Sequence, residues 1–292
     1  MLRKILKQYV SRKKEKSRDL MPSKKTSNFS GSDGLRKEIF VSLICLIVFW
    51  YFFAGWSQSP PIRFMDRTFF IYFDKITRRS WSFDILINNI FQTNTAKIVP
   101  MLACIVWLIF ERRRQGQNIL FFGHIILGSL LAMILSRLMQ NFSAYRPRPI
   151  HSSSLAYDLP YGIDTSALEG WSSFPSDTSA LAFSISAGIF LASRRLGAAA
   201  LLWTIVVIAF PRAYAGLHYP SDLVGGASIG LFCTLGASPL IFRVITSKVR
   251  FTINEKWMPL LWTLSFLYIF QVGTMFDDVR NYGSFIKEVL DF

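Results

Sequence analysis

Seven long apolar stretches divide the chain, and they constrain its fold more than any other feature of the sequence. A helix needs roughly 20 mainly apolar residues to cross the ~30 Å hydrocarbon core of a bilayer. Stretches of about this kind, separated by polar breakers, cover residues 39–56, 98–110, 119–135, 179–192, 196–210, 223–242 and 257–276. The pattern therefore predicts an all-α fold, a polytopic membrane helix bundle with seven spans.

The composition supports a membrane protein and excludes two other classes. Apolar residues make up 51% of the chain and charged residues only 17%, against about 25% charged residues in ordinary soluble domains. Such a chain is neither a typical soluble domain nor intrinsically disordered, because disorder requires low hydrophobicity. The three cysteines, Cys45, Cys104 and Cys233, lie far apart in apolar stretches, so a disulfide framework is not indicated.

Positive charge is concentrated at the N-terminus. The net charge is +15, and residues 1–37 hold twelve Lys or Arg against three acidic residues. Next to a membrane, such a segment gains about 1 kcal/mol per basic residue from anionic lipids. We therefore expect residues 1–38 to form a basic cytoplasmic tail that contacts anionic lipid headgroups, and we do not expect nucleic acid as a partner.

Basic residues also orient the predicted spans, because short basic loops stay in the cytoplasm. The loops 111–117, 193–195 and 243–256 are basic and would share the inner side with the N-terminal tail. Residues 57–97 would then lie outside; they carry four arginines but also acids, and their apolar content predicts helices on the outer face. This topology favours a bacterial inner (plasma) membrane with the C-terminus outside, and an endoplasmic reticulum membrane stays open.

The outer segments contain a histidine and an acid with suggestive spacing. His218 and Asp222 are four residues apart, so one helical turn would place them on the same face. A carboxylate that holds one imidazole nitrogen leaves the other free as a nucleophile. The alternative is a polar interfacial turn with a hydrogen-bonded histidine.

Two further outer segments could bind phosphate. Arg146 and Arg148 alternate with prolines, which hold both guanidinium groups on a stiff turn, and arginine suits phosphate through its bidentate fork. Ser176 and Asp177 follow a proline and predict a helix N-terminus, which presents free backbone donors to an anion. Headgroup anchoring by the arginines and an ordinary helix cap are the alternatives.

Together these segments resemble the type 2 phosphatidic acid phosphatase superfamily. The family blocks are Lys-x6-Arg-Pro, Pro-Ser-Gly-His or Pro-Ser-Asp-His, and Ser-Arg-x5-His-x3-Asp. The chain matches them in Arg148-Pro149, in Pro175-Ser176-Asp177 and in Arg212-x5-His218-x3-Asp222. The resemblance implies a six-span phosphatase-like membrane domain over residues 39–242, so that residues 243–292 would add a cytoplasmic loop, a seventh span and a short outer tail.

The resemblance also implies roles for single residues. His218 would be the nucleophile that forms a phosphohistidine, and Asp222 would orient it. Four further residues would bind the phosphoryl oxygens: Arg146, Arg148, Ser176 and Arg212. Neither a metal nor another cofactor is implied.

The chain departs from the family pattern at two positions. Asn141 stands where the family has Lys, and Thr178 stands where it has the His that protonates the leaving group. Arg137 could replace the missing cation, and His151 or Asp177 could supply the missing proton. General acid catalysis contributes about 10²- to 10⁴-fold in rate, whereas a phosphate leaving group with a pKa of about 6 departs without much help. The two substitutions therefore favour diphosphate substrates over alkyl phosphates.

Two classes of function follow from this sequence. The first is a membrane phosphatase or phosphotransferase that acts at the outer face on a lipid-linked phosphate or diphosphate, such as a polyprenyl diphosphate or a glycolipid phosphate. The sequence does not choose between water and a hydroxyl acceptor. The second is a non-catalytic lipid-phosphate binding or assembly partner derived from the same fold. The sequence makes no prediction of the oligomeric state.

Overall fold

The structure is a computed structural model, and it describes two main parts of the chain. These are residues 59–242, except 153, 154, 156 and 167, and residues 258–276, together with positions 40, 43, 44 and 47. The basic tail, most of the first predicted span, the loop after residue 242 and the tail after residue 276 lie outside the described residues.

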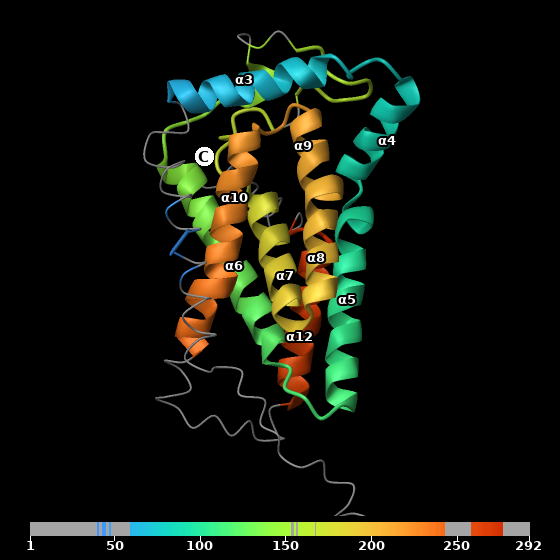
Figure 1. The fold of residues 1–292 in the computed structure, drawn as a ribbon, viewed down its shortest axis with the longest axis vertical. Helices are drawn as coiled ribbons and strands as arrows, with labels where there is room; N and C mark the ends of the chain where they lie inside the picture. The colour runs from blue at the N-terminus through green and yellow to red at the C-terminus, as the bar shows by residue number, and fades with distance from the viewer. Residues whose placement is uncertain are drawn as a thin grey trace, which may run out of the picture.

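The described parts of the chain are helical and contain no strand, which confirms the predicted all-α class. Most of the helices run along the long axis of the molecule, and α3 lies across one end of them (Figure 1). In chain order the helical segments are α3 (Pro60–Asp74), α4 (Trp81–Gln92), α5 (Asn94–Arg114), α6 (Leu120–Phe142), η2 (Pro149–His151), α7 (Asp177–Ala192), α8 (Arg194–Trp203), η3 (Thr204–Ala209), α9 (Phe210–Tyr214), α10 (Pro220–Phe232), η4 (Cys233–Ala237) and α12 (Met258–Gly273).

Within the described residues, four helical runs are long and apolar enough to cross a membrane, so the chain is a membrane protein. They are Asn94–Arg114, Phe121–Phe142, Arg194–Tyr214 and Pro220–Phe242, and the apolar helices Asp177–Ala192 and Pro259–Gly273 are shorter. All six coincide with predicted spans. The first predicted span cannot be compared, because it lies almost entirely outside the described residues.

Several predicted span boundaries are wrong. The third span was expected to end at residue 135, but its helix continues to Phe142. The fifth span was expected to end at residue 210, but the helix continues to Tyr214 and carries Arg212 in its last turn. Pro211 has no backbone donor, and the wider π-type turn of η3 immediately before it lets the helix continue past the proline. Arg212 is therefore held on a helix and not in a loop.

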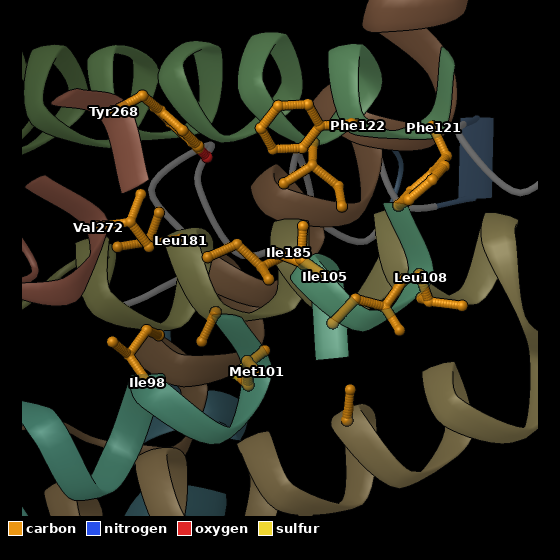
Figure 2. Packing of buried hydrophobic residues seen from close by; sticks show 14 of the residues in the cluster. Ile98, Met101, Ile105, Leu108, Phe121, Phe122, Leu181, Ile185, Tyr268 and Val272 are labelled. Atoms are coloured by element: carbon orange, nitrogen blue, oxygen red, sulfur yellow. The ribbon is translucent and has the colours of Figure 1, made fainter. Parts of the chain in front are cut away.

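The core of the bundle forms around α7. Apolar side chains of α7 pack against those of α5, α6 and α12 in one cluster. Figure 2 labels ten of these side chains, from Ile98 to Val272. On another side α10 approaches α7 closely, because a Cβ atom at Gly226 or Gly230 would lie 2.2 Å from a carbonyl oxygen of the α7 segment. Small residues allow such close helix packing in membranes, and here the contact fixes the start of α10 against the start of α7.

Helix α3 closes the end of the bundle at which α7 and α10 begin. Its buried face repeats every three to four residues, with Ile62, Asp66, Phe70 and Phe73, as expected for an amphipathic helix. The ring of Phe70 packs edge-on against the ring of Tyr219, with ring centroids 5.8 Å apart. The prediction of helices within residues 57–97 is thus confirmed.

Candidate functional site

Three polar segments meet beneath α3: two come from the chain between α6 and α7, and the third lies around the start of α10. The backbone N–H of Ser173 donates to the carbonyl of Arg146 over 2.9 Å, and the N–H of Ser176 donates to the carbonyl of Asp222 over 3.1 Å. The N–H of Ile150 donates to the carbonyl of Gly216 over 2.7 Å. These backbone bonds join segments up to about seventy residues apart, so the histidine, the arginines and the helix start share one site.

His218 lies at the centre of this site and is only 1% exposed. Its Nδ1 lies 2.9 Å from the carbonyl oxygen of Ser173, which can only accept, so Nδ1 carries the proton. Burial, and then the positive charge of Arg148, lower the pKa of His218 to about 4. At neutral pH the imidazole is therefore uncharged, and its Nε2 holds a free electron pair.

Two buried arginines lie around the imidazole. Nη1 of Arg148 is 3.2 Å from Nε2 of His218 and also donates to the carbonyl of Leu217 over 2.8 Å. The Nε of Arg148 is buried and has no hydrogen-bond partner among the described residues. Arg212 lies close enough for its charge to lower the pKa of His218, and its carbonyl accepts the N–H of His218 over 3.3 Å. A phosphoryl group at Nε2 would thus meet two guanidinium groups.

Asp222 does not hold the imidazole in the way the spacing suggested. Helix α10 begins at Pro220, so His218 lies in the turn before it and the two residues do not share a helix face. The closest carboxylate oxygen is 3.8 Å from Nδ1, which is too long for a hydrogen bond. This oxygen accepts instead from the hydroxyl of Ser173 and from the backbone N–H of Tyr219, the latter over 2.8 Å. Asp222 therefore positions the segment whose carbonyl binds the imidazole.

Arg146 is engaged by two carboxylates. Its Nη2 lies 2.6 Å from an oxygen of Asp66, and its Nη1 donates to Asp222 and, over 2.8 Å, to the hydroxyl of Ser221. The guanidinium also lies over the ring of Tyr219, 4.1 Å from its centroid. Through these contacts Arg146 joins α3 to the start of α10. The resemblance implied that Arg146 binds phosphate, but most of its donor groups are already engaged by protein side chains.

Asp66 belongs to this site, although it was not among the candidate residues predicted from the sequence. It is 1% exposed on the buried face of α3, and its oxygens accept the N–H of Ser221 over 3.0 Å and the hydroxyl of Ser221 over 2.6 Å. Burial raises the pKa of Asp66, and the charge of Arg146 opposes this rise. The available signal was its position four residues after Ile62 and four before Phe70, on an apolar face where an acid needs a buried partner.

The two departures from the family pattern lie in different environments. Asn141 is exposed near the end of α6, whereas Thr178 is buried in the first turn of α7. Arg137, one turn before Asn141, forms an ion pair with Asp177 at 3.2 Å. The other oxygen of Asp177 accepts the backbone N–H of Thr178 over 2.7 Å. A cation from α6 thus reaches the start of α7, although it does not come from position 141.

The remaining candidate residues have local roles. The hydroxyl of Ser176 accepts the N–H of Ser179 over 3.4 Å and caps α7. His151 ends η2, and its N–H donates to the carbonyl of Arg148 over 3.0 Å. No group of three His, Cys, Asp or Glu that could hold a metal ion is found among residues 59–242 and 258–276 as described.

A titration checks the protonation state of His218. We expect the imidazole of His218 to titrate near pH 4, because burial and Arg148 disfavour its charged form. An unfolded chain would take up this proton near pH 6.5, so stability falls as the pH drops from about 6.5 to 4. Histidine NMR of purified wild-type protein and of His218→Gln identifies the signal, and a pKa of 6.5 or above would contradict the buried geometry.

The chain is similar to several known proteins. Residues 142–249 match the PAP2 superfamily. The chain is 29% identical over 153 residues to YbjG of Escherichia coli (strain K12), whose name assigns it provisionally to the undecaprenyl-diphosphatases; the match covers 52% of this chain and 70% of that protein. It is 24% identical over 146 residues to undecaprenyl-diphosphatase BcrC of Bacillus subtilis (strain 168), which covers 49% of this chain and 67% of the relative.

A solved structure is also similar. It is the first transmembrane PAP2 type phosphatidylglycerolphosphate phosphatase from Bacillus subtilis, with 16% sequence identity and a TM-score of 0.42. The similarity covers 71% of this chain and 97% of that protein.

Proposed function

From the match of residues 142–249 to the PAP2 superfamily, we propose that the chain is a lipid phosphatase of this family that works through a phosphohistidine at His218. The observation that carries the proposal is the state of the imidazole. Its Nδ1 proton is held by the carbonyl of Ser173, and its Nε2 faces Arg148 at 3.2 Å. A neutral, oriented imidazole beside a cation is suited to attack a phosphorus atom.

The reaction consists of two displacements. Nε2 attacks the phosphorus, the bond from phosphorus to the leaving oxygen breaks, and the phosphoryl group moves to the histidine. Water or a hydroxyl acceptor then attacks the phosphorus and releases the imidazole. Arg148 and Arg212 stabilise the negative charge on the phosphoryl oxygens, and substrate binding replaces the contact between Arg148 and Nε2.

Asp222 and Ser173 support the imidazole while it carries the phosphoryl group. Phosphorylated Nε2 leaves the ring positively charged as long as Nδ1 keeps its proton. The carbonyl of Ser173 accepts a hydrogen bond from the protonated Nδ1, and the negatively charged carboxylate of Asp222 lies 3.8 Å from Nδ1. This arrangement stabilises the intermediate and fixes the tautomer.

The surroundings of Thr178 support a diphosphate as the substrate. A threonine hydroxyl is a poor acid, and the neighbouring carboxylate of Asp177 is engaged by Arg137 and by the backbone N–H of Thr178. A phosphate monoester departs without protonation more easily than an alkoxide does. We therefore propose a polyprenyl diphosphate or a related lipid diphosphate, a class that agrees with the names of the curated relatives.

Phosphate release tests the proposal directly. Purified protein is offered a polyprenyl diphosphate and an alkyl lipid monophosphate side by side, and we expect faster release from the diphosphate. Acid hydrolyses phosphohistidine, so the intermediate is trapped under basic conditions. Release from neither substrate, together with saturable binding of both, would favour a non-catalytic lipid-phosphate binding protein.

A single substitution tests the role of position 178. We expect Thr178→His to raise turnover of alkyl monophosphates by up to about 10²-fold and turnover of diphosphates much less, because only the alkoxide needs the proton. Parallel kinetics on both substrates measure the difference, with Thr178→Asn as a polar variant that lacks an acid. Equal wild-type rates on the two substrates would mean that another residue already supplies the proton.

We further propose that the site faces the outside of a bacterial inner membrane. The basic loops support this orientation, which leaves the N-terminus in the cytoplasm and the basic tail on anionic headgroups. Reporter fusions after residues 116, 150, 216 and 292 are expected to read inside, outside, outside and outside. An inside signal after residue 150 would contradict both the topology and the outer location of the site.

A further inference from the structure

A cavity of about 300 Å³ lies beneath α3, beside the residues that support His218. It is lined by Arg63, Asp66 and Arg67 of α3 together with Arg146 and Tyr219. Its size is at the lower end for small-molecule pockets. A cavity of this size can hold a phosphate group together with part of a lipid headgroup.

The charges around this cavity favour an anion. Arg63 and Arg67 are four residues apart, so they lie one above the other on the same face of α3. Asp66, the acid in the cavity wall, already accepts from Arg146 and from Ser221. Within the described part of the chain, no carboxylate lies within ion-pair distance of Arg63 or Arg67. Two guanidinium groups thus face one cavity without a compensating charge from these residues.

We infer that this cavity is a second phosphate-binding site, distinct from the one at His218. Two arginines one helical turn apart can each donate paired N–H groups to phosphate oxygens, a geometry that suits a dianionic phosphate. The ligand is a phosphate monoester or diphosphate group, carried by a lipid headgroup or present as free phosphate. The argument rests on the cavity and its charges, and does not depend on turnover at His218.

The position of the cavity gives the bound group a route to the catalytic site. Arg146 lines the cavity and also pairs with Asp222, and Asp66 lines it and holds the start of α10 through Ser221. An anion here adds negative charge next to Arg146 and so competes with the two carboxylates for it. An anion bound in the cavity therefore weakens the ion pair between Arg146 and Asp222.

Binding measurements on Arg148→Gln test the inference apart from catalysis, because this variant disables the site at His218. Inorganic phosphate is titrated calorimetrically into the full-length protein in detergent. A second series uses nanodiscs of phosphatidylcholine with or without phosphatidic acid. We expect one saturable site, and adding Arg63→Gln and Arg67→Gln should weaken binding at least about 100-fold. Binding of phosphate alone identifies free phosphate as a ligand, and binding of phosphatidic acid only identifies a lipid headgroup; either result supports the site.

Two control pairs complete the test. Arg194→Gln with Arg195→Gln removes the same charge from an exposed part of α8 and should leave binding unchanged. Arg63→Lys with Arg67→Lys keeps the charge but loses the paired N–H donors, so it should weaken binding clearly less than the glutamine pair does, which excludes misfolding as the cause of a loss. Unchanged binding in the Arg63→Gln, Arg67→Gln protein, or an equal loss in the α8 control, would overturn the inference even if the enzyme hydrolyses lipid diphosphates normally.

Discussion

Replacement of His218 by alanine is expected to abolish turnover and to leave the protein folded in the membrane. In the proposed mechanism the imidazole forms the covalent intermediate, and its Nε2 lies 3.2 Å from Nη1 of Arg148. Removing a covalent nucleophile costs about 10⁴-fold or more in rate. Alanine leaves no atom that could take over this role.

Phosphate release from a lipid diphosphate measures the loss, and the base-stable phosphoenzyme should disappear with it. His124→Gln is the matched control, because His124 bonds to Ser238 within the spans and away from the site. Asp222→Asn should be slower than wild type but active, because the carbonyl of Ser173 still fixes the tautomer. If His218→Ala turned over substrate as fast as the wild-type protein, His218 would not be the nucleophile and the fold would serve another purpose.

Replacement of Arg146 by methionine is expected to destabilise the protein by about 3–5 kcal/mol, the usual effect of breaking a buried ion pair. The change leaves Asp66 and Asp222 buried without their shared cation. Turnover should fall as well, because Asp222 then no longer holds Ser173 in place. Structural and catalytic losses thus arise from one side chain.

Unfolding in detergent, followed by denaturant or heat, measures the stability change. Arg195→Met is the control, since Arg195 is exposed on α8. Adding Asp66→Asn to Arg146→Met should restore part of the lost stability, because it removes one of the two stranded charges. A stability of Arg146→Met equal to that of the control would mean that the pairs with Asp66 and Asp222 contribute nothing to the fold.

Much of the fold could be predicted because membrane spans depend on local sequence. An apolar stretch of sufficient length must form a helix in a bilayer, since its backbone groups find no other partners there. The six predicted spans within the described residues match helices for this reason. The end of the fifth span was wrong because the π-type turn that carries the helix past Pro211 leaves no simple signature in hydropathy.

By itself, the sequence determined the helical class and the residue types of the site: a histidine, an acid and arginines at one end of the spans. Only the tertiary structure decided how they work together. Asp66 reaches Arg146 across eighty residues, and the carbonyl of Ser173, forty-five residues away, holds the imidazole in place of Asp222. Such contacts depend on how α3, α7 and α10 pack, and spacing along the chain carries no information about a backbone carbonyl or an acid from a distant helix.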